Sequence, residues 1–205
     1  RRHSDGLFGS SLISLGLWVG GSNTPNTYED AVQLLAQLRD GEAPNQSFQI
    51  DLCPWCGTEL IDLTDTDTIG ISATNSAVRF NCPNKMCDFH DLLPLTTVDA
   101  DIYDRPPTML VGTVDKFARL AWEDKAGVLL GSGSQQGPSL VIQDEFHLIS
   151  GPLGSIVGAY EAAFSVVMAA NGVRPKMIAS TATIRRADQQ SRGVFGRGVH
   201  LFPPS

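Results

Sequence analysis

The sequence predicts an α/β fold in which helices flank a parallel sheet and a small metal-binding β module is inserted into the chain. The first observation is a strand–helix–strand series: residues 140–142 and 175–183 have strand character, and residues 155–170 between them read as a helix. Two strands joined by a helix at this spacing form a βαβ unit, whose strands run parallel. The second observation is a group of four cysteines confined to residues 53–87, which predicts the inserted module.

Length and charge limit the classes of protein to which the chain can belong. Its 205 residues suffice for one domain core with a small insert, and its apolar content of 42% is ordinary for a globular protein. No apolar run approaches the length of a membrane span. The net charge of −7 argues against a protein that wraps nucleic acid mainly through phosphate contacts. It still allows local contacts made by a few side chains and backbone amides.

The first elements expected along the chain are a strand and a helix. Residues 13–19 form an apolar strand that ends at a pair of glycines. Thr27 and Asp30 have the spacing of a capping box, which predicts a helix over residues 28–40. Its apolar residues recur at helical spacing and are assigned to the core: Ala31, Leu34, Leu35 and Leu38.

The cysteines lie in two pairs separated by 25 residues. The spacing is Cys-x2-Cys and then Cys-x4-Cys, and the residues are Cys53, Cys56, Cys82 and Cys87. Such pairs form knuckles whose backbone amides point at the sulfur atoms and stabilise thiolates around a tetrahedral zinc ion. Because four thiolates fill the coordination shell, this zinc would be structural. Two disulfides or a redox Cys-x-x-Cys are the alternatives, but nothing else indicates an oxidising compartment and the second pair lacks the redox spacing.

Other residues of the insert have roles that the sequence leaves open. Residues 59–63 and 69–80 alternate in polarity and suit a β-ribbon that joins the two knuckles. His90 follows the second knuckle and is interpreted as a bystander, because four cysteines already complete the site. Trp55 and Phe89 are candidates for stacking on a nucleic-acid base, and packing within the protein is the alternative.

The chain after the insert is expected to form a strand, a helix and a flexible loop. Residues 105–112 read as a strand, and residues 117–130 as a helix. The glycine-rich and serine-rich residues 131–138 have the composition of a flexible loop.

The apolar strand at residues 140–142 runs directly into Asp144, Glu145 and His147. We expect this strand to be covered on both faces and to present its carboxylates at its carboxyl end, where open α/β sheets bind ligands. Asp144 would hold Mg²⁺ through water, and Glu145 would orient the water that attacks a γ-phosphate. For the tetrad Asp-Glu-Phe-His at residues 144–147 taken alone, the alternative is an ordinary strand followed by an acidic loop.

Small hydroxyl residues end the strand at residues 175–183. Thr181 and Thr183 can approach the tip of the neighbouring strand and hydrogen-bond to its acidic residues or to His147. Residues 151–155 are interpreted as a turn before the intervening helix. Residues 184–197 contain four arginines, which could face nucleic acid or a partner, or form a solvated loop.

These motifs resemble those of a known family. An Asp-Glu-x-His followed by a Thr-Ala-Thr on the next strand resembles motifs II and III of superfamily 2 helicases. The longer strings at residues 143–155 and 179–187 resemble the helicase-like subunit of DISARM anti-phage systems. Residues 13–21 and 105–117 resemble the segments that contact nucleic acid in such helicases.

The resemblance implies a RecA-like lobe built from residues 1–50 and 92–205, with a zinc-ribbon-like insert at residues 51–91. It implies catalytic roles for Asp144, Glu145, His147, Thr181 and Thr183. It implies nucleic-acid contacts from Gly20, Gly21, Gly112, Thr113, Asp115 and Lys116. ATP and Mg²⁺ would bind in the intact protein, His147 would link the nucleotide site to the nucleic-acid side, and the partner would be single-stranded or duplex DNA.

The sequence contains no Gly-x-x-x-x-Gly-Lys-Ser/Thr loop, the element that cradles phosphates. We therefore expect the chain to be part of a longer protein that supplies this loop and a second RecA-like lobe, and to hydrolyse no ATP alone. The intact protein is expected to be an ATP-dependent helicase or DNA translocase of bacterial phage defence, cytoplasmic, without membrane contact, and paired with a further subunit. The alternative is a non-catalytic, helicase-derived module that binds DNA or a partner and holds a structural zinc.

Overall fold

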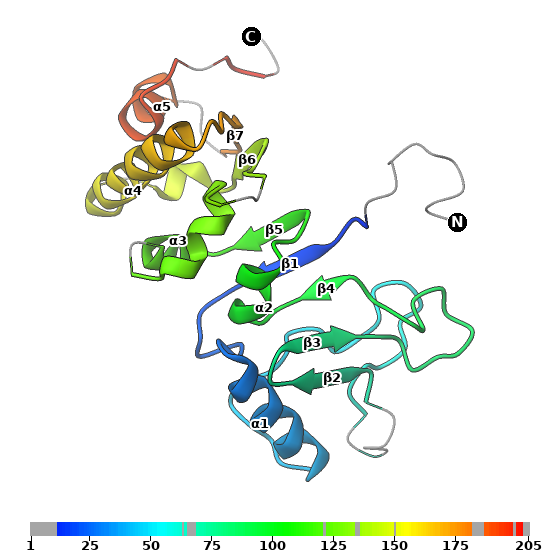
Figure 1. Ribbon diagram of the computed structural model, residues 1–205. Helices are drawn as coiled ribbons and strands as arrows, with labels where there is room; N and C mark the ends of the chain where they lie inside the picture. Colours follow the sequence, from blue (N-terminus) through cyan, green and yellow to red (C-terminus); the bar gives the residue numbers. More distant parts are fainter. Residues whose placement is uncertain are drawn as a thin grey trace. The chain divides into compact units, whose positions relative to one another are not determined.

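The computed structural model describes residues 12–62, 64, 69–120, 122–133, 136–149, 151–181, 187–198 and 200–202. The fold is mixed α/β with parallel strands and flanking helices, as the sequence predicts (Figure 1). The chain divides into two compact units, residues 1–116 and residues 117–205. Each unit is described by itself.

The first unit contains a three-stranded parallel sheet in the order β4-β1-β5. Its strands are β1 (Leu15–Trp18), β4 (Leu95–Thr96) and β5 (Met109–Gly112). Trp18 pairs with Gly112 in the register of β1 and β5, so the loops that follow both strands begin at the same edge. Trp18 is completely buried and packs edge-on against Tyr103 of α2 (Asp99–Asp104), with ring centroids 6.1 Å apart.

The first helix confirms the predicted capping box. In α1 (Tyr28–Arg39), the Thr27 hydroxyl accepts a hydrogen bond from the Asp30 amide, and the Asp30 carboxylate accepts one from the Thr27 amide. The helix ends at Asp40, and Gly41 follows with φ +75°, a conformation that favours glycine. The four residues assigned to its core face are buried: Ala31, Leu34, Leu35 and Leu38.

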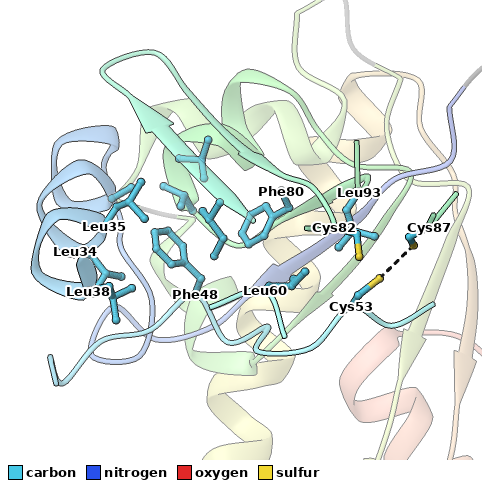
Figure 2. Close-up of a cluster of buried hydrophobic side chains, with 14 residues drawn as sticks. Leu34, Leu35, Leu38, Phe48, Cys53, Leu60, Phe80, Cys82, Cys87 and Leu93 are labelled. Carbon is cyan, nitrogen blue, oxygen red and sulfur yellow. Dashed lines mark hydrogen bonds between the residues drawn. The ribbon is translucent and has the colours of Figure 1, made fainter. Parts of the chain in front are cut away.

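The cysteine insert shares one hydrophobic core with α1. Its antiparallel hairpin pairs β2 (Ile71–Thr74) with β3 (Ala77–Phe80). Figure 2 shows leucines of α1 facing Phe48 and Phe80, with Cys53, Cys82 and Cys87 at the other end of the same cluster. The ribbon is shorter than predicted, because Glu59 makes only an isolated bridge to Leu52.

The second unit contains the predicted βαβ arrangement. Strands β6 (Leu140–Gln143) and β7 (Lys176–Ala179) pair in parallel, and α4 (Gly151–Ala170) lies between them in the chain. A final helix, α5 (Ala187–Phe195), packs with α4. Among the described helices, including the 20-residue α4, none is long and apolar enough to cross a membrane.

Three further sequence expectations are wrong in detail. Residues 151–155 form the beginning of α4 rather than a separate turn. The helix expected at residues 117–130 is split into α3 (Val114–Arg119) and the 3₁₀ helix η2 (Asp124–Leu130), which Glu123 caps. The β6 strand is not covered on both faces, because Leu140 and Ile142 alternate with half-buried neighbours and are exposed.

Candidate functional site

The acidic tetrad forms a tight turn at the carboxyl end of β6. Asp144 follows the strand directly, and its Oδ1 accepts a hydrogen bond from the amide of Glu145 at 2.9 Å. Glu145 has φ 50° and ψ 40°, a left-handed conformation that non-glycine residues rarely adopt. The short 3₁₀ helix η3 (Phe146–Leu148) begins immediately after it. A strained residue at the end of a strand is typical of functional turns.

The side chains of Glu145 and His147 face each other across this turn. Oε2 of Glu145 lies 3.3 Å from Nδ1 of His147, which is an ion-pairing distance when the imidazole is protonated. The two groups do not meet hydrogen-bond geometry, since His147 Nδ1 has no such partner among the described residues. Asp144 and Glu145 are both exposed, so their carboxylates are accessible to a ligand.

Backbone hydrogen bonds tie this turn to the end of β7. The amide of Phe146 donates to the carbonyl of Ser180 at 2.8 Å, and the amide of Ser180 donates to the carbonyl of Gln143 at 2.9 Å. Thr181 is the next residue and is half-buried. The structure therefore brings Asp144, Glu145, His147 and Thr181 to one edge of the β6-β7 sheet. Thr183, the other predicted hydroxyl residue, lies outside the described residues.

Sequence reasoning missed two residues of α5 that contact the turn. The side-chain amide of Gln190 donates to the carbonyls of Phe146 at 2.8 Å and Ile149 at 2.6 Å. The ring of Phe195 stacks on that of Phe146 with centroids 5.2 Å apart. No local pattern signals either contact, because both join residues more than 40 positions apart in the chain.

The four cysteines form one compact cluster, as their spacing predicts. Their sulfur atoms lie within 4.8 Å of one another, with Cys53 and Cys87 3.9 Å apart (Figure 2) and Cys56 and Cys82 3.5 Å apart. All four are free cysteines in the structure rather than members of disulfides. Sulfur atoms around a tetrahedral zinc lie roughly 3.8 Å apart, given a Zn–S bond of about 2.3 Å. The cluster could therefore hold a metal ion such as zinc.

The surroundings of the cluster fit this interpretation. The hydroxyl of Thr58, 3.2 Å from the sulfur, lowers the pKa of the Cys56 thiol to about 6. Burial raises the pKa of the Cys82 thiol to about 12, so a bound cation is needed to keep it a thiolate. Nδ1 of His90 lies 2.9 Å from the backbone carbonyl of Cys82, so His90 neighbours the cysteine cluster. The rings of Trp55 and Phe89 pack against each other, with centroids 5.8 Å apart.

The residues expected to contact nucleic acid lie mostly at the carboxyl edge of the first unit's sheet. The amide of Thr113 donates to the carbonyl of Trp18 at 3.2 Å, which places the loop after β5 beside the loop that carries the glycine pair. Five of these residues are exposed or half-buried: Gly20, Gly21, Gly112, Thr113 and Asp115. Lys116 differs, because it is buried and its Nζ donates to Asp99 and Asn26.

Comparison with known proteins finds a similar protein that is described as a DISARM protein. No protein-family model matches the sequence. The chain is 33% identical over 244 residues to a protein of Bacillus paralicheniformis described as DISARM protein DrmA. The match includes 99% of this chain but 22% of that protein, so the chain spans about a fifth of the length of its relative. The match supports the predicted resemblance to a DISARM protein.

Proposed function

Starting from the relationship of this DISARM-related chain to the protein DrmA, we propose that it forms part of the ATPase lobe of a DNA helicase or translocase. The activity would serve phage defence in the bacterial cytoplasm. The observation that carries the proposal is the turn at the end of β6. There Asp144, Glu145 and His147 lie beside the end of a parallel neighbouring strand that leads into Thr181.

The donor set of the turn fits Mg²⁺ and a nucleoside triphosphate. Asp144 offers an exposed carboxylate, the hard oxygen ligand that Mg²⁺ prefers, and would hold the ion through water. When bound, the ion supplies neutralisation of the charge that develops on the phosphates. Glu145 is also exposed, so its carboxylate can accept a proton from a water molecule and orient it for attack.

His147 and Thr181 would respond to the state of this site. The imidazole of His147 lies 3.3 Å from the carboxylate of Glu145. A movement of this carboxylate would therefore alter the contact between the two side chains. Thr181 follows Ser180, whose carbonyl accepts from Phe146, so a shift of the turn is transmitted to the end of β7. Thr183 is assigned the same role by the sequence resemblance.

The first unit would supply the nucleic-acid contacts. The exposed Thr113, together with the backbone amides around Gly20 and Gly112, can donate hydrogen bonds to a DNA backbone without a large positive field. This matches the acidic net charge of −7. The zinc cluster would have a structural role, because four sulfur ligands leave no open coordination position.

The deciding experiment uses the intact protein with Glu145→Gln. We expect the variant to bind ATP and Mg²⁺ with unchanged affinity and to lose nearly all hydrolysis, since the amide cannot accept a proton. Turnover equal to that of the unaltered protein rejects the assigned role. A second arm uses this chain alone, for which we expect no Mg²⁺-dependent ATP hydrolysis because its sequence has no phosphate-binding loop.

One observation favours a second function. The absence of a phosphate-binding loop from the sequence also fits a non-catalytic module that holds DNA or a partner subunit and contains a structural zinc. The Glu145→Gln comparison distinguishes the two functions, because a non-catalytic module has no ATP hydrolysis that could depend on the Glu145 carboxylate. DNA binding that persists while ATP binding is absent would favour this second function.

A further inference from the structure

The turn formed by residues 144–149 is buried on one side and exposed on the other. Phe146 and Ile149 have exposed fractions of 2% and 6%, and they belong to a hydrophobic cluster with Val157 of α4 and Val194 of α5. Glu145, by contrast, points to solvent with a side chain that is 61% exposed. The position of its carboxylate therefore depends on how firmly the buried residues hold the backbone.

Helix α5 contributes to that hold through Gln190, in addition to the ring of Phe195 and the backbone bond between Phe146 and Ser180. The amide of Gln190 donates both of its hydrogens, to the carbonyl of Phe146 and to the carbonyl of Ile149. These two carbonyls stand at the beginning and the end of the turn that follows Glu145. A single planar amide that bridges both of them fixes their separation and orientation.

The left-handed conformation of Glu145 makes such a hold necessary. A non-glycine residue with φ 50° is strained and returns to an ordinary conformation unless its surroundings prevent it. The carbonyl of Phe146 that accepts from Gln190 belongs to the residue directly after Glu145. The peptide unit between Glu145 and Phe146 is held by the Phe146 amide, which donates to the carbonyl of Ser180. Gln190 holds the next peptide unit through the Phe146 carbonyl, so that the backbone after Glu145 cannot swing freely.

We propose that Gln190 is a positioning residue that holds the Asp144–His147 turn in its strained, active conformation. The expected effect of Gln190 on catalysis rests on the proposed function. The expected effect of Gln190 on the rigidity of the turn does not. Gln190 touches no reacting atom and acts through the backbone of Phe146 and Ile149.

The test compares Gln190→Met with Gln189→Met in the intact protein. Methionine keeps the length and helix propensity of glutamine but donates no hydrogen bond. Gln189 neighbours Gln190 on the same helix and is exposed, so its variant controls for the substitution. The measurements are amide hydrogen exchange across residues 144–149 and, separately, kcat and KM for ATP.

We expect Gln190→Met to raise exchange within residues 144–149 only, and to lower kcat by roughly 10- to 100-fold with little change in KM. Exchange equal to that of Gln189→Met overturns the proposal. A rise in exchange that extends over β7 and α4 would indicate a general packing role and also overturns the proposal. Faster exchange within residues 144–149 without a fall in kcat overturns it as well. If the intact protein shows no Glu145-dependent turnover, the proposed function fails, and the exchange comparison alone still decides whether Gln190 holds the turn.

Discussion

Nζ of Lys116 lies 2.5 Å from Oδ2 of Asp99, and the two side chains are 1% and 8% exposed. The same ammonium donates to Oδ1 of Asn26 at 3.2 Å, and the hydroxyl of Tyr103 donates to Asp99. The buried cation thus connects α3, α2 and the loop that follows the glycine pair. These three segments extend from the same edge of the β4-β1-β5 sheet, where the nucleic-acid contacts are proposed.

The Lys116–Asp99 pair should show strong coupling in a double-mutant cycle. Lys116→Met or Asp99→Asn alone leaves an unpaired buried group and should cost about 3–5 kcal/mol of unfolding free energy. The double variant should lose much less than the sum, because it removes both charges. Urea denaturation measures all four proteins. The exposed Arg192–Asp188 pair is the matched control, and Arg192→Ala should cost at most about 1 kcal/mol.

The burial of Lys116 also predicts how the proposed DNA binding depends on salt concentration. A lysine that neutralises a phosphate contributes about 0.9 to the slope of log affinity against log salt concentration. Since Lys116 is occupied by Asp99 and Asn26, the slope for the Asp99→Asn, Lys116→Met double variant should equal that of the unaltered protein. Fluorescence anisotropy with labelled DNA gives the slopes. A decrease of about 0.9 would show that Lys116 contacts DNA directly, as the sequence resemblance implies.

Local signals explain what the sequence predicts well. The capping box at Thr27 and Asp30 depends on residues three positions apart, and the first helix begins as expected. The order of β6, α4 and β7 follows from apolar periodicity, and the cysteine cluster follows from the spacing of its knuckles. In each case the deciding interactions lie within a short stretch of chain or within a motif of fixed geometry.

Long-range contacts explain what the sequence leaves out. Lys116 looks like a surface cation until Asp99, 17 positions earlier, is found beside it. Gln190 lies in a segment interpreted only for its arginines, yet it bonds to Phe146, 44 positions away. The apolar sequence of β6 predicts burial on both faces, but a sequence does not reveal which neighbours cover a strand. Tertiary packing decides all three.

Metal removal should destabilise the first unit as a whole. Cys53, Cys82 and Cys87 are buried in the same cluster as the leucines of α1, so loss of the ion removes the link that holds the two cysteine pairs together within this core. We expect about one zinc per chain by elemental analysis. Cys82→Ser should lose it and unfold with several kcal/mol less free energy. Met86→Ala, next to Cys87 but 90% exposed, should keep both metal and stability. Retained stability after chelation would contradict the structural role.

The stability of the second unit should depend on pH through Glu161. Burial raises the pKa of this carboxyl, although Arg197 acts in the opposite direction. Because the folded-state pKa is the higher one, the stability contributed by Glu161 is complete below about pH 4 and is lost as pH rises through the folded value. Glu161→Gln should therefore melt at a higher temperature at pH 7, with the difference closing in acid. The exposed Asp124→Asn should show no comparable difference, and equal melting of Glu161→Gln and the unaltered protein at pH 7 would contradict the argument.

The strain at Glu145 predicts an inverted order of stability between alanine and glycine. At φ 50° a Cβ atom is unfavourable by about 1–2 kcal/mol, so Glu145→Gly should unfold at a higher urea concentration than Glu145→Ala. At Leu148, three positions later and without a positive φ, the usual order should hold, with glycine the less stable replacement. The same order at both positions would mean that Glu145 does not keep the left-handed conformation in solution. An inverted order, together with loss of turnover in both Glu145 variants, would mean that the protein retains a destabilising residue there because its carboxylate is needed.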